Sequence, residues 1–217
     1  MTGKSITDGT KRNRGGWALE QCSSARDWTW AREAAIFAAL VSSGVALRLA
    51  GHEWPNFAPV AAMALFAGYF FRSALVAVCV PLTVMAISDQ FLGGYHWGVM
   101  VLVYGMLVFP VLLRGWLRQT FVLGRGRLSA RLTPLAGLLS CSLLSSILFF
   151  VVTNFGVWLG FATYETSWSG LCECYLAAIP FFRYTLAGDL FFAVVLFGSY
   201  ALALSMAPAL QPAAEIN

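Results

Sequence analysis

The stretch that decides the fold is VAAMALFAGYFFRSALVAVCVPLTVMAI, residues 60–87. A single helix of this length would exceed the roughly 20 residues that cross a bilayer. Two short helices that turn at Arg72 and Ser73, near its middle, fit the stretch equally well by length. The choice matters because it decides on which side of the membrane every later segment lies.

The distribution of positive charge decides between these readings. With a hairpin, one side of the membrane receives the basic N-terminal tail, Arg72 and the five-arginine loop at 114–131, and the other side receives Arg48 and Arg183. With a single span, the five-arginine loop would lie opposite the basic N-terminus, which violates the positive-inside bias. We therefore expect a hairpin, with both termini in the cytoplasm.

Composition requires a lipid environment. Of the 217 residues, 59% are hydrophobic and 11% are charged, and the mean hydropathy is +0.72, whereas about a quarter of an average soluble domain is charged. The net charge of +4 does not indicate nucleic-acid binding, since the Lys and Arg residues flank apolar runs and form no continuous stripe. The five cysteines, an odd number, do not form a disulfide framework.

The apolar runs predict an all-α, polytopic transmembrane bundle of six helices in the bacterial inner (cytoplasmic) membrane. The expected spans are Ala34–Leu47, Val60–Phe71, Ser73–Ile87, Gly98–Leu113, Leu135–Gly160 and Leu190–Leu210. They lie in a membrane domain of residues 34–210, between a polar, basic cytoplasmic tail (1–33) and a short C-terminal tail (211–217). The tail carries no apolar core of a cleaved signal peptide, and a surface helix is expected around Trp17–Trp30.

One apolar stretch and one arginine do not fit the pattern of simple membrane spans. The apolar stretch Leu171–Phe182 is too short to cross a bilayer and is interpreted as a re-entrant or partly inserted segment. If it crosses fully, the C-terminus moves to the outside. Arg48 lies at the end of the first span and is expected to reach the lipid headgroups.

The loops on the external side gather polar and aromatic side chains. The candidate ligand-binding residues are Asn56, Asp89, His96, Trp97, Asn154, Tyr164 and Asp189. Aromatic walls with a few polar groups are typical of small-molecule pockets, but Trp and Tyr are also enriched at any membrane interface. Asp89 and Asp189 lie near the ends of apolar runs, where an Asp either caps a helix or binds a ligand. For Asn154, a hydrogen bond between helices and a ligand contact remain open.

Cysteines and small residues suggest two further features. Cys79, Cys172 and Cys174 are candidate ligands of a transition metal, although a lone Cys-x-Cys pair is a weak signal and free cysteines are the alternative. Ala34 and Ala38, with Ala35 and Ala39 beside them, recur at a spacing that lets helices approach closely. This row faces either a partner subunit or the protein's own bundle.

Several motifs resemble a family. Residues 55–66 (PNFAPVAAMALF), 81–89, 153–158 (TNFGVW) and 177–190 look like an uncharacterised family of small bacterial integral membrane proteins. In size, helix number and topology that group is similar to the S components of energy-coupling-factor (ECF) vitamin transporters. The resemblance implies an outward-facing pocket for a vitamin or metal ion, a first-helix Ala-x-x-x-Ala surface that docks a transmembrane coupling subunit, and separate ATPases.

Three classes of function follow. The first is a substrate-binding subunit for uptake of a small solute such as a vitamin, cofactor precursor or metal complex. The second is a non-transporting scaffold or assembly factor, whose basic cytoplasmic face binds a partner or anionic lipid. The third, a membrane enzyme, is disfavoured because the sequence has no nucleophile elbow, paired-His zinc helix, P-loop or dinucleotide fingerprint. No catalytic residue and no cofactor are expected.

Overall fold

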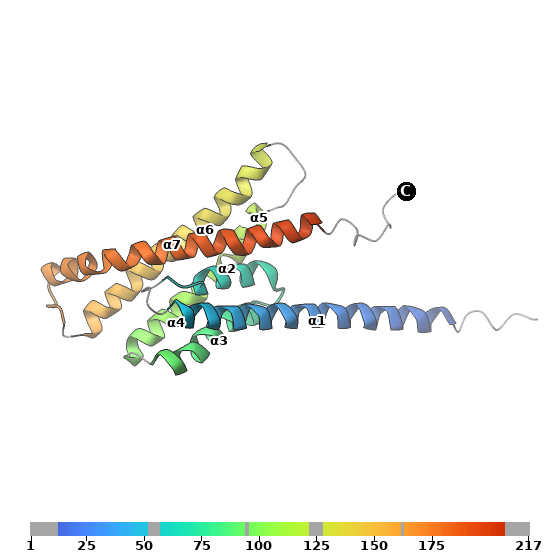
Figure 1. Ribbon diagram of the computed structural model, residues 1–217, viewed down its shortest axis with the longest axis horizontal. Coiled ribbons are helices and arrows are strands. Elements are labelled where there is room, and N and C mark those ends of the chain that lie inside the picture. Colours follow the sequence, from blue (N-terminus) through green and yellow to red (C-terminus); the bar gives the residue numbers. More distant parts are fainter. Residues whose placement is uncertain (1–12, 52–56, 94–95, 122–127, 162, 207–217) are drawn as a thin grey trace, which may run out of the picture. The chain divides into compact units, whose positions relative to one another are not determined.

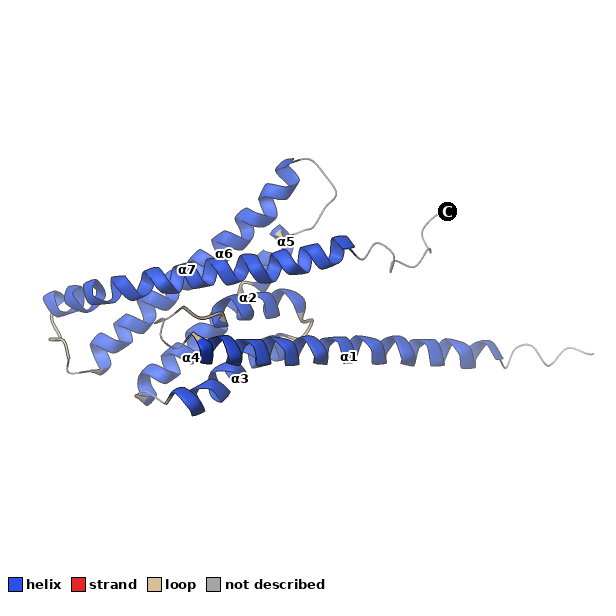
Figure 2. Cartoon of the chain, viewed as in Figure 1, coloured by secondary structure: helices blue, strands red, loops and turns tan. Residues whose placement is uncertain are grey.

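The computed structural model describes residues 13–51, 57–93, 96–121, 128–161 and 163–206. These residues form seven α-helices, and Figure 2 shows that the described part of the chain is helical throughout, with short loops between the helices. The helices are α1 (Asn13–Ala50), α2 (Val60–Phe70), α3 (Ala74–Leu92), α4 (Trp97–Leu112), α5 (Arg114–Thr120), α6 (Leu128–Gly160) and α7 (Trp168–Met206) (Figure 1).

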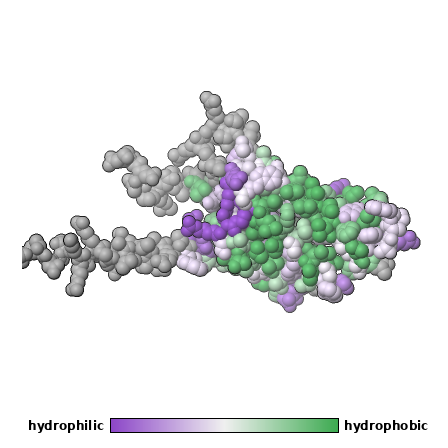
Figure 3. All heavy atoms as spheres, turned by 180° about the vertical axis from the view of Figure 1, so that it is seen from behind, coloured by the Kyte–Doolittle hydropathy of each residue, from purple (hydrophilic) through white to green (hydrophobic). Residues whose placement is uncertain are grey.

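Five segments of the described chain are long and apolar enough to cross a membrane. They are Trp30–Ala50, Ala74–Leu92, Trp97–Thr120, Thr133–Gly160 and Trp168–Leu204, and α2 is a shorter apolar helix. Exposed side chains on these segments include many large hydrophobic residues, and the view in Figure 3 shows an extensive hydrophobic surface over the described residues. The protein is therefore a multi-pass membrane protein, as its composition predicts.

The chain divides into two compact units, Met1–Ala39 and Leu40–Asn217. Helix α1 begins at Asn13, so the tail is helical well before the first expected span. The expected surface helix at Trp17–Trp30 is part of this longer helix, because no proline interrupts residues 13–50. The second unit contains the end of α1 and all later helices.

The hairpin prediction is confirmed, since α2 ends at Phe70 and α3 begins at Ala74. Ser73 caps α3 by accepting a hydrogen bond from the Val76 N–H, and Phe71 is extended. An extended residue followed by a Ser cap ends one helix and starts the next within three residues.

Helix α2 is the core of the second unit. Eight of its eleven residues are buried, and it contacts α3, α4, α5, α6 and α7. A helix surrounded by protein on all sides need not match the thickness of the bilayer. This burial explains how so short a segment is accommodated in a membrane protein.

Pairs of contacts give the directions of the helices. Arg48 of α1 contacts Asp89 near the end of α3. Between α6 and α7, Ser146 contacts Asp189, and the later residue Asn154 contacts the earlier residue Cys174. α6 and α7 are therefore antiparallel. α7 runs parallel to α2, because Gly188 lies against Ala58 and Phe197 lies against Phe66.

These directions place two sets of residues at opposite ends of the second unit. The turn after α2 lies beside α5, because Arg114 donates to the Arg72 carbonyl, and we call this the arginine end. The starts of α4 and α7 lie with the end of α6, because His96 contacts Phe161 and the Trp158 indole donates to the Glu165 carbonyl. We call this the tryptophan end, after Trp97 and Trp168.

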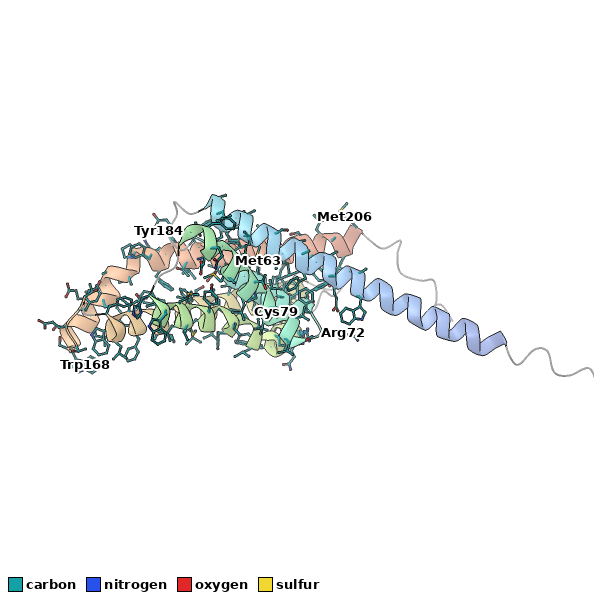
Figure 4. The ribbon with its side chains drawn as sticks, turned by 90° about the horizontal axis from the view of Figure 1, so that it is seen from below. Met63, Arg72, Cys79, Trp168, Tyr184 and Met206 are labelled. Carbon is teal, nitrogen blue, oxygen red and sulfur yellow. The ribbon has the colours of Figure 1, made fainter. Side chains whose placement is uncertain are left out.

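Helix α7 corrects the sequence-based interpretation of the last part of the chain. Leu171–Phe182 is neither re-entrant nor a loop, but belongs to one helix that runs from Trp168 to Met206. Pro180 lies inside this helix, and Figure 4 shows that the portion between Trp168 and Tyr184 runs obliquely to the remainder. A proline inside a helix removes one backbone donor and bends the helix without necessarily ending it. The C-terminal portion of α7 runs towards the arginine end.

Candidate functional site

A charged cluster joins α1, α3 and α4 towards the tryptophan end. Arg48 Nη1 lies 2.6 Å from Asp89 Oδ1 and 2.5 Å from Ser88 Oγ. The Tyr104 hydroxyl donates to Asp89 Oδ2 over 2.9 Å. The side chains of Arg48 and Asp89 are only 17% and 5% exposed, so this ion pair is largely removed from solvent.

This cluster corrects two sequence-based expectations. Arg48 turns towards Asp89 instead of extending to the headgroups, because a charge that finds an opposite charge within the protein needs no lipid partner. Asp89 lies in the last turn of α3, where its carboxylate cannot accept the free N–H groups of a helix start. It is an ion-pair residue, not a cap.

A second carboxyl lies between α6 and α7. Asp189 is 4% exposed, and its Oδ2 lies 2.6 Å from Ser146 Oγ. The capping role expected for Asp189 is wrong, because α7 starts twenty-one residues earlier, at Trp168. Asp189 is instead an acidic residue in the interior of a membrane-spanning helix.

The start of α2 contacts a neighbour of each of these two carboxyl groups. A Cβ atom added to Gly188, the neighbour of Asp189, would meet Phe57 and the Ala58 nitrogen at 3.3–3.4 Å. On the other side, Val60 belongs to a buried cluster with Val84, Met85 and Leu107, against which Tyr104 packs. Tyr104 is also the residue that binds Asp89. Residues 57–60 therefore pack against neighbours of both carboxyls.

The first turn of α2 has no side-chain cap. Pro59 stands at the N-cap position, and its side chain, which has no acceptor, forms no capping hydrogen bond with the helix start. The free N–H groups of a first turn carry partial positive charge, and here Pro59 and Val60 are buried. An uncapped helix start inside a membrane protein is a place where polar groups bind.

Two arginines hold the other end of α2. Arg118 Nε donates to the Tyr69 carbonyl over 3.0 Å and its Nη2 donates to the Phe71 carbonyl over 2.6 Å. Arg114 Nη2 donates to the Arg72 carbonyl over 2.7 Å. These bonds satisfy carbonyls that the end of a helix leaves free. Sequence reasoning assigned both arginines only to a basic loop. The signal it missed was that α2, earlier in the chain, is short and ends in a polar turn whose carbonyls need donors.

The remaining predicted ligand residues do not gather into one site. His96 caps α4 by accepting from the Gly98 N–H, and Tyr164 is half-buried in the loop before α7. Trp97 is 74% exposed and Trp168 is 83% exposed. This exposure favours a position in the interfacial aromatic belt over a position in the wall of a pocket. The Asn154 amide donates to the Phe150 carbonyl of its own helix. Asn56 lies outside the described residues.

The candidate metal ligands are also apart. Cys172 and Cys174 lie in the first turns of α7 and Cys79 lies in α3; Cys79 and Cys172 are exposed and Cys174 is buried. Among the described residues, no group of three or more His, Cys, Asp or Glu side chains is arranged to hold a metal ion. In the described part of the chain, Cys79, Cys141, Cys172 and Cys174 are free thiols.

The predicted docking row, Ala34, Ala35, Ala38 and Ala39, lies on the part of α1 that belongs to the first unit. In the second unit, α1 approaches its neighbouring helices closely at a glycine and not at one of these alanines. A Cβ atom at Gly44 of α1 would meet Met63 and Val84 at 2.8 Å. The bundle's own contact with α1 therefore includes a close approach at a residue that the alanine pattern did not contain.

Comparison with known proteins gives one result. No curated protein and no solved structure matches the chain, so similarity to the S components of ECF transporters stays a prediction. One family model, described as a family of unknown function (DUF6580), matches residues 29–210. That match covers the end of the N-terminal unit and nearly all of the membrane bundle. The chain belongs to the DUF6580 family.

Proposed function

We propose that the protein is a solute-binding membrane subunit that takes part in the uptake of a small polar solute. The observation that carries this proposal is the pair of buried carboxyls, Asp89 and Asp189, whose neighbours Tyr104 and Gly188 pack against the start of α2. Ionisable groups inside membrane proteins are costly and mark ligand or ion pathways. Helices that begin within the membrane form binding sites in many transporters.

The solute class follows from the groups available. The free N–H groups of α2 favour an anionic or strongly dipolar group, and Phe57, which contacts Phe191 and Phe192, provides an apolar surface beside them. A vitamin, a cofactor precursor or a metal complex combines these properties. The start of α2 lies towards the tryptophan end, which is external if the arginine end is cytoplasmic.

Energy for uptake comes from partner subunits, since the sequence has no nucleotide-binding motif. A transmembrane coupling subunit docks on the alanine row of α1, and separate ATPases drive the cycle. Replacement of Ala34 and Ala38 by Leu would thicken that face and release the coupling subunit. The control is Leu75→Ala on the exposed face of α3, which should leave the coupling subunit bound.

Native mass spectrometry of the protein isolated gently from its own membrane tests the proposal. We expect a small molecule that dissociates on activation, together with transmembrane partner subunits. The bound mass should disappear in Asp89→Asn and persist in Glu165→Gln, which changes an exposed carboxyl in the loop before α7. If the wild-type protein carries neither a small molecule nor a partner, the proposal is wrong.

The alternative, a scaffold with a basic cytoplasmic face, has less support from the contacts. Two of the five arginines that motivated it, Arg114 and Arg118, bind backbone carbonyls at the end of α2. Crosslinking from Arg127, outside the described residues, would favour the scaffold if it captured one defined cytoplasmic protein in preference to lipid.

A further inference from the structure

The Ser146 hydroxyl makes two short contacts, one with Asp189 and one with the Ser142 carbonyl. Ser146 Oγ lies 2.6 Å from Asp189 Oδ2 and 3.0 Å from the Ser142 carbonyl oxygen. Both distances are those of hydrogen bonds. A carbonyl oxygen and a carboxylate oxygen only accept, and the serine hydroxyl has a single hydrogen.

The protonation state of the carboxyl decides how these contacts are made. If Asp189 were ionised, the one hydroxyl hydrogen would be shared between the carboxylate and the Ser142 carbonyl as a three-centre hydrogen bond. If Asp189 carries a proton, it donates to Ser146, and Ser146 donates to Ser142. The protonated form therefore gives each contact its own hydrogen, whereas the ionised form divides one hydrogen between two acceptors.

The surroundings of Asp189 agree with a neutral group. Among the described residues, no Lys, Arg or His forms an ion pair with it. The helices packed against α7 are α6 and α2. From residue 133 onward on α6 and along α2, their titratable side chains are Cys141 and Tyr69. On α7 itself, Glu173 and Arg183 are exposed, and the other titratable side chains are Cys172, Cys174, Tyr175, Tyr184 and Tyr200. A buried carboxylate without a cation is strongly disfavoured.

Asp89 provides an internal comparison. Both of its oxygens accept, one from the Arg48 guanidinium and one from the Tyr104 hydroxyl. The two buried carboxyls therefore differ in their partners, since Asp89 meets a guanidinium and Asp189 meets a serine hydroxyl.

We propose that Asp189 is a proton-binding site within the membrane, occupied while α6 and α7 are packed together at Ser146. Release breaks the Asp189 O–H bond and passes the proton to water, which must reach the carboxyl through an opening between α6 and α7. Proton release and separation of these two helices are therefore coupled. This inference concerns the bundle itself and does not require the protein to bind a solute.

Infrared spectroscopy of the purified full-length protein in lipid tests the assignment, because a protonated carboxyl has a C=O stretching band separate from the carboxylate and amide bands. We expect this band at neutral pH in the wild-type protein, where the exposed acids are ionised. It should be absent in Asp189→Asn and unchanged in Asp89→Asn. A wild-type protein without the band, or a band that survives Asp189→Asn, would overturn the proposal.

A second variant keeps the test decisive if Asp189→Asn does not fold. Ser146→Ala retains the carboxyl but removes the acceptor of its hydrogen bond, so the C=O band should move to higher wavenumber. Ser145→Ala is the matched control, because Ser145 bonds the Cys141 carbonyl of its own helix and not Asp189. A band at the same position in all three proteins would show that the protonated group is not Asp189.

Discussion

At the scale of single residues, the chemistry of the bundle depends on where each charge finds a partner. Asp89 and Arg48 are forty-one positions apart and meet across two helices. Because both are largely buried, removal of one leaves the other without compensation, whereas removal of both replaces an ion pair by apolar contact. The pair therefore determines how α1 sits against α3 in the second unit.

Arg48→Met should lower the free energy of unfolding by about 3 kcal/mol, since it leaves Asp89 charged and unpaired. The double variant Arg48→Met, Asp89→Leu should recover most of that loss. Thermal unfolding in detergent measures both. Equal destabilisation by the single and the double variant would mean that the ion pair does not govern stability.

Arg118→Ala should lower the free energy of unfolding by about 2 kcal/mol, because two charge-assisted hydrogen bonds to the end of α2 are lost. Arg72→Ala is the control of equal charge, since the Arg72 side chain is exposed and its carbonyl remains in place. Comparison of their unfolding midpoints gives the contribution of the contacts alone. Similar midpoints for both variants would contradict a capping role.

At the scale of elements, the short helix α2 is held by close contact with its neighbours. Gly68 is the point of nearest approach to α4: an added Cβ atom would lie 3.1 Å from the Val111 Cα and 3.3 Å from its carbonyl oxygen. Backbone atoms cannot move away as a flexible side chain can, so the distance between the helices depends on this glycine.

Gly68→Ala should destabilise the protein by about 1–3 kcal/mol, since α4 must shift to admit the methyl group. Gly105→Ala is the matched control on α4 itself: no atom lies within 4 Å of its added Cβ, and alanine favours helix. The control should be as stable as the wild type or slightly more so. A Gly68→Ala variant with wild-type unfolding would show that α2 and α4 are loosely packed.

At the scale of the whole molecule, contacts within the second unit agree with the expected alternation of spans. The turn at Arg72 and helix α5 share one end, and the starts of α4 and α7 share the other. Which end faces the cytoplasm follows from the positive-inside bias, and the arginine end carries the basic residues. We therefore predict that the arginine end is cytoplasmic.

Labelling in intact cells tests this orientation. In a protein whose native cysteines have been replaced, Thr166→Cys in the loop before α7 should react with a membrane-impermeant maleimide. Arg72→Cys should react only after permeabilisation. Both residues are exposed, so their reactivity reports sidedness instead of burial. The reverse pattern would invert the predicted topology.

The sequence by itself determined the membrane environment, the all-helical class and the hairpin at Arg72, because hydropathy and the charges beside each span act locally or through the membrane as a whole. It did not determine α7. A proline and polar residues suggested a break near residues 171–189, but α6 packs along the helix and keeps it continuous.

Only the tertiary structure decided the roles of the polar residues. Asp89 and Asp189 looked alike in sequence, each near the end of an apolar run, yet one meets an arginine of α1 and the other a serine of α6. Ion pairing and hydrogen bonding depend on partners on other helices, fifteen to forty-three residues away, which no local pattern specifies. The same reason explains why Arg118 binds the end of α2 and why Gly44, outside the alanine rows, lies close to Met63 and Val84.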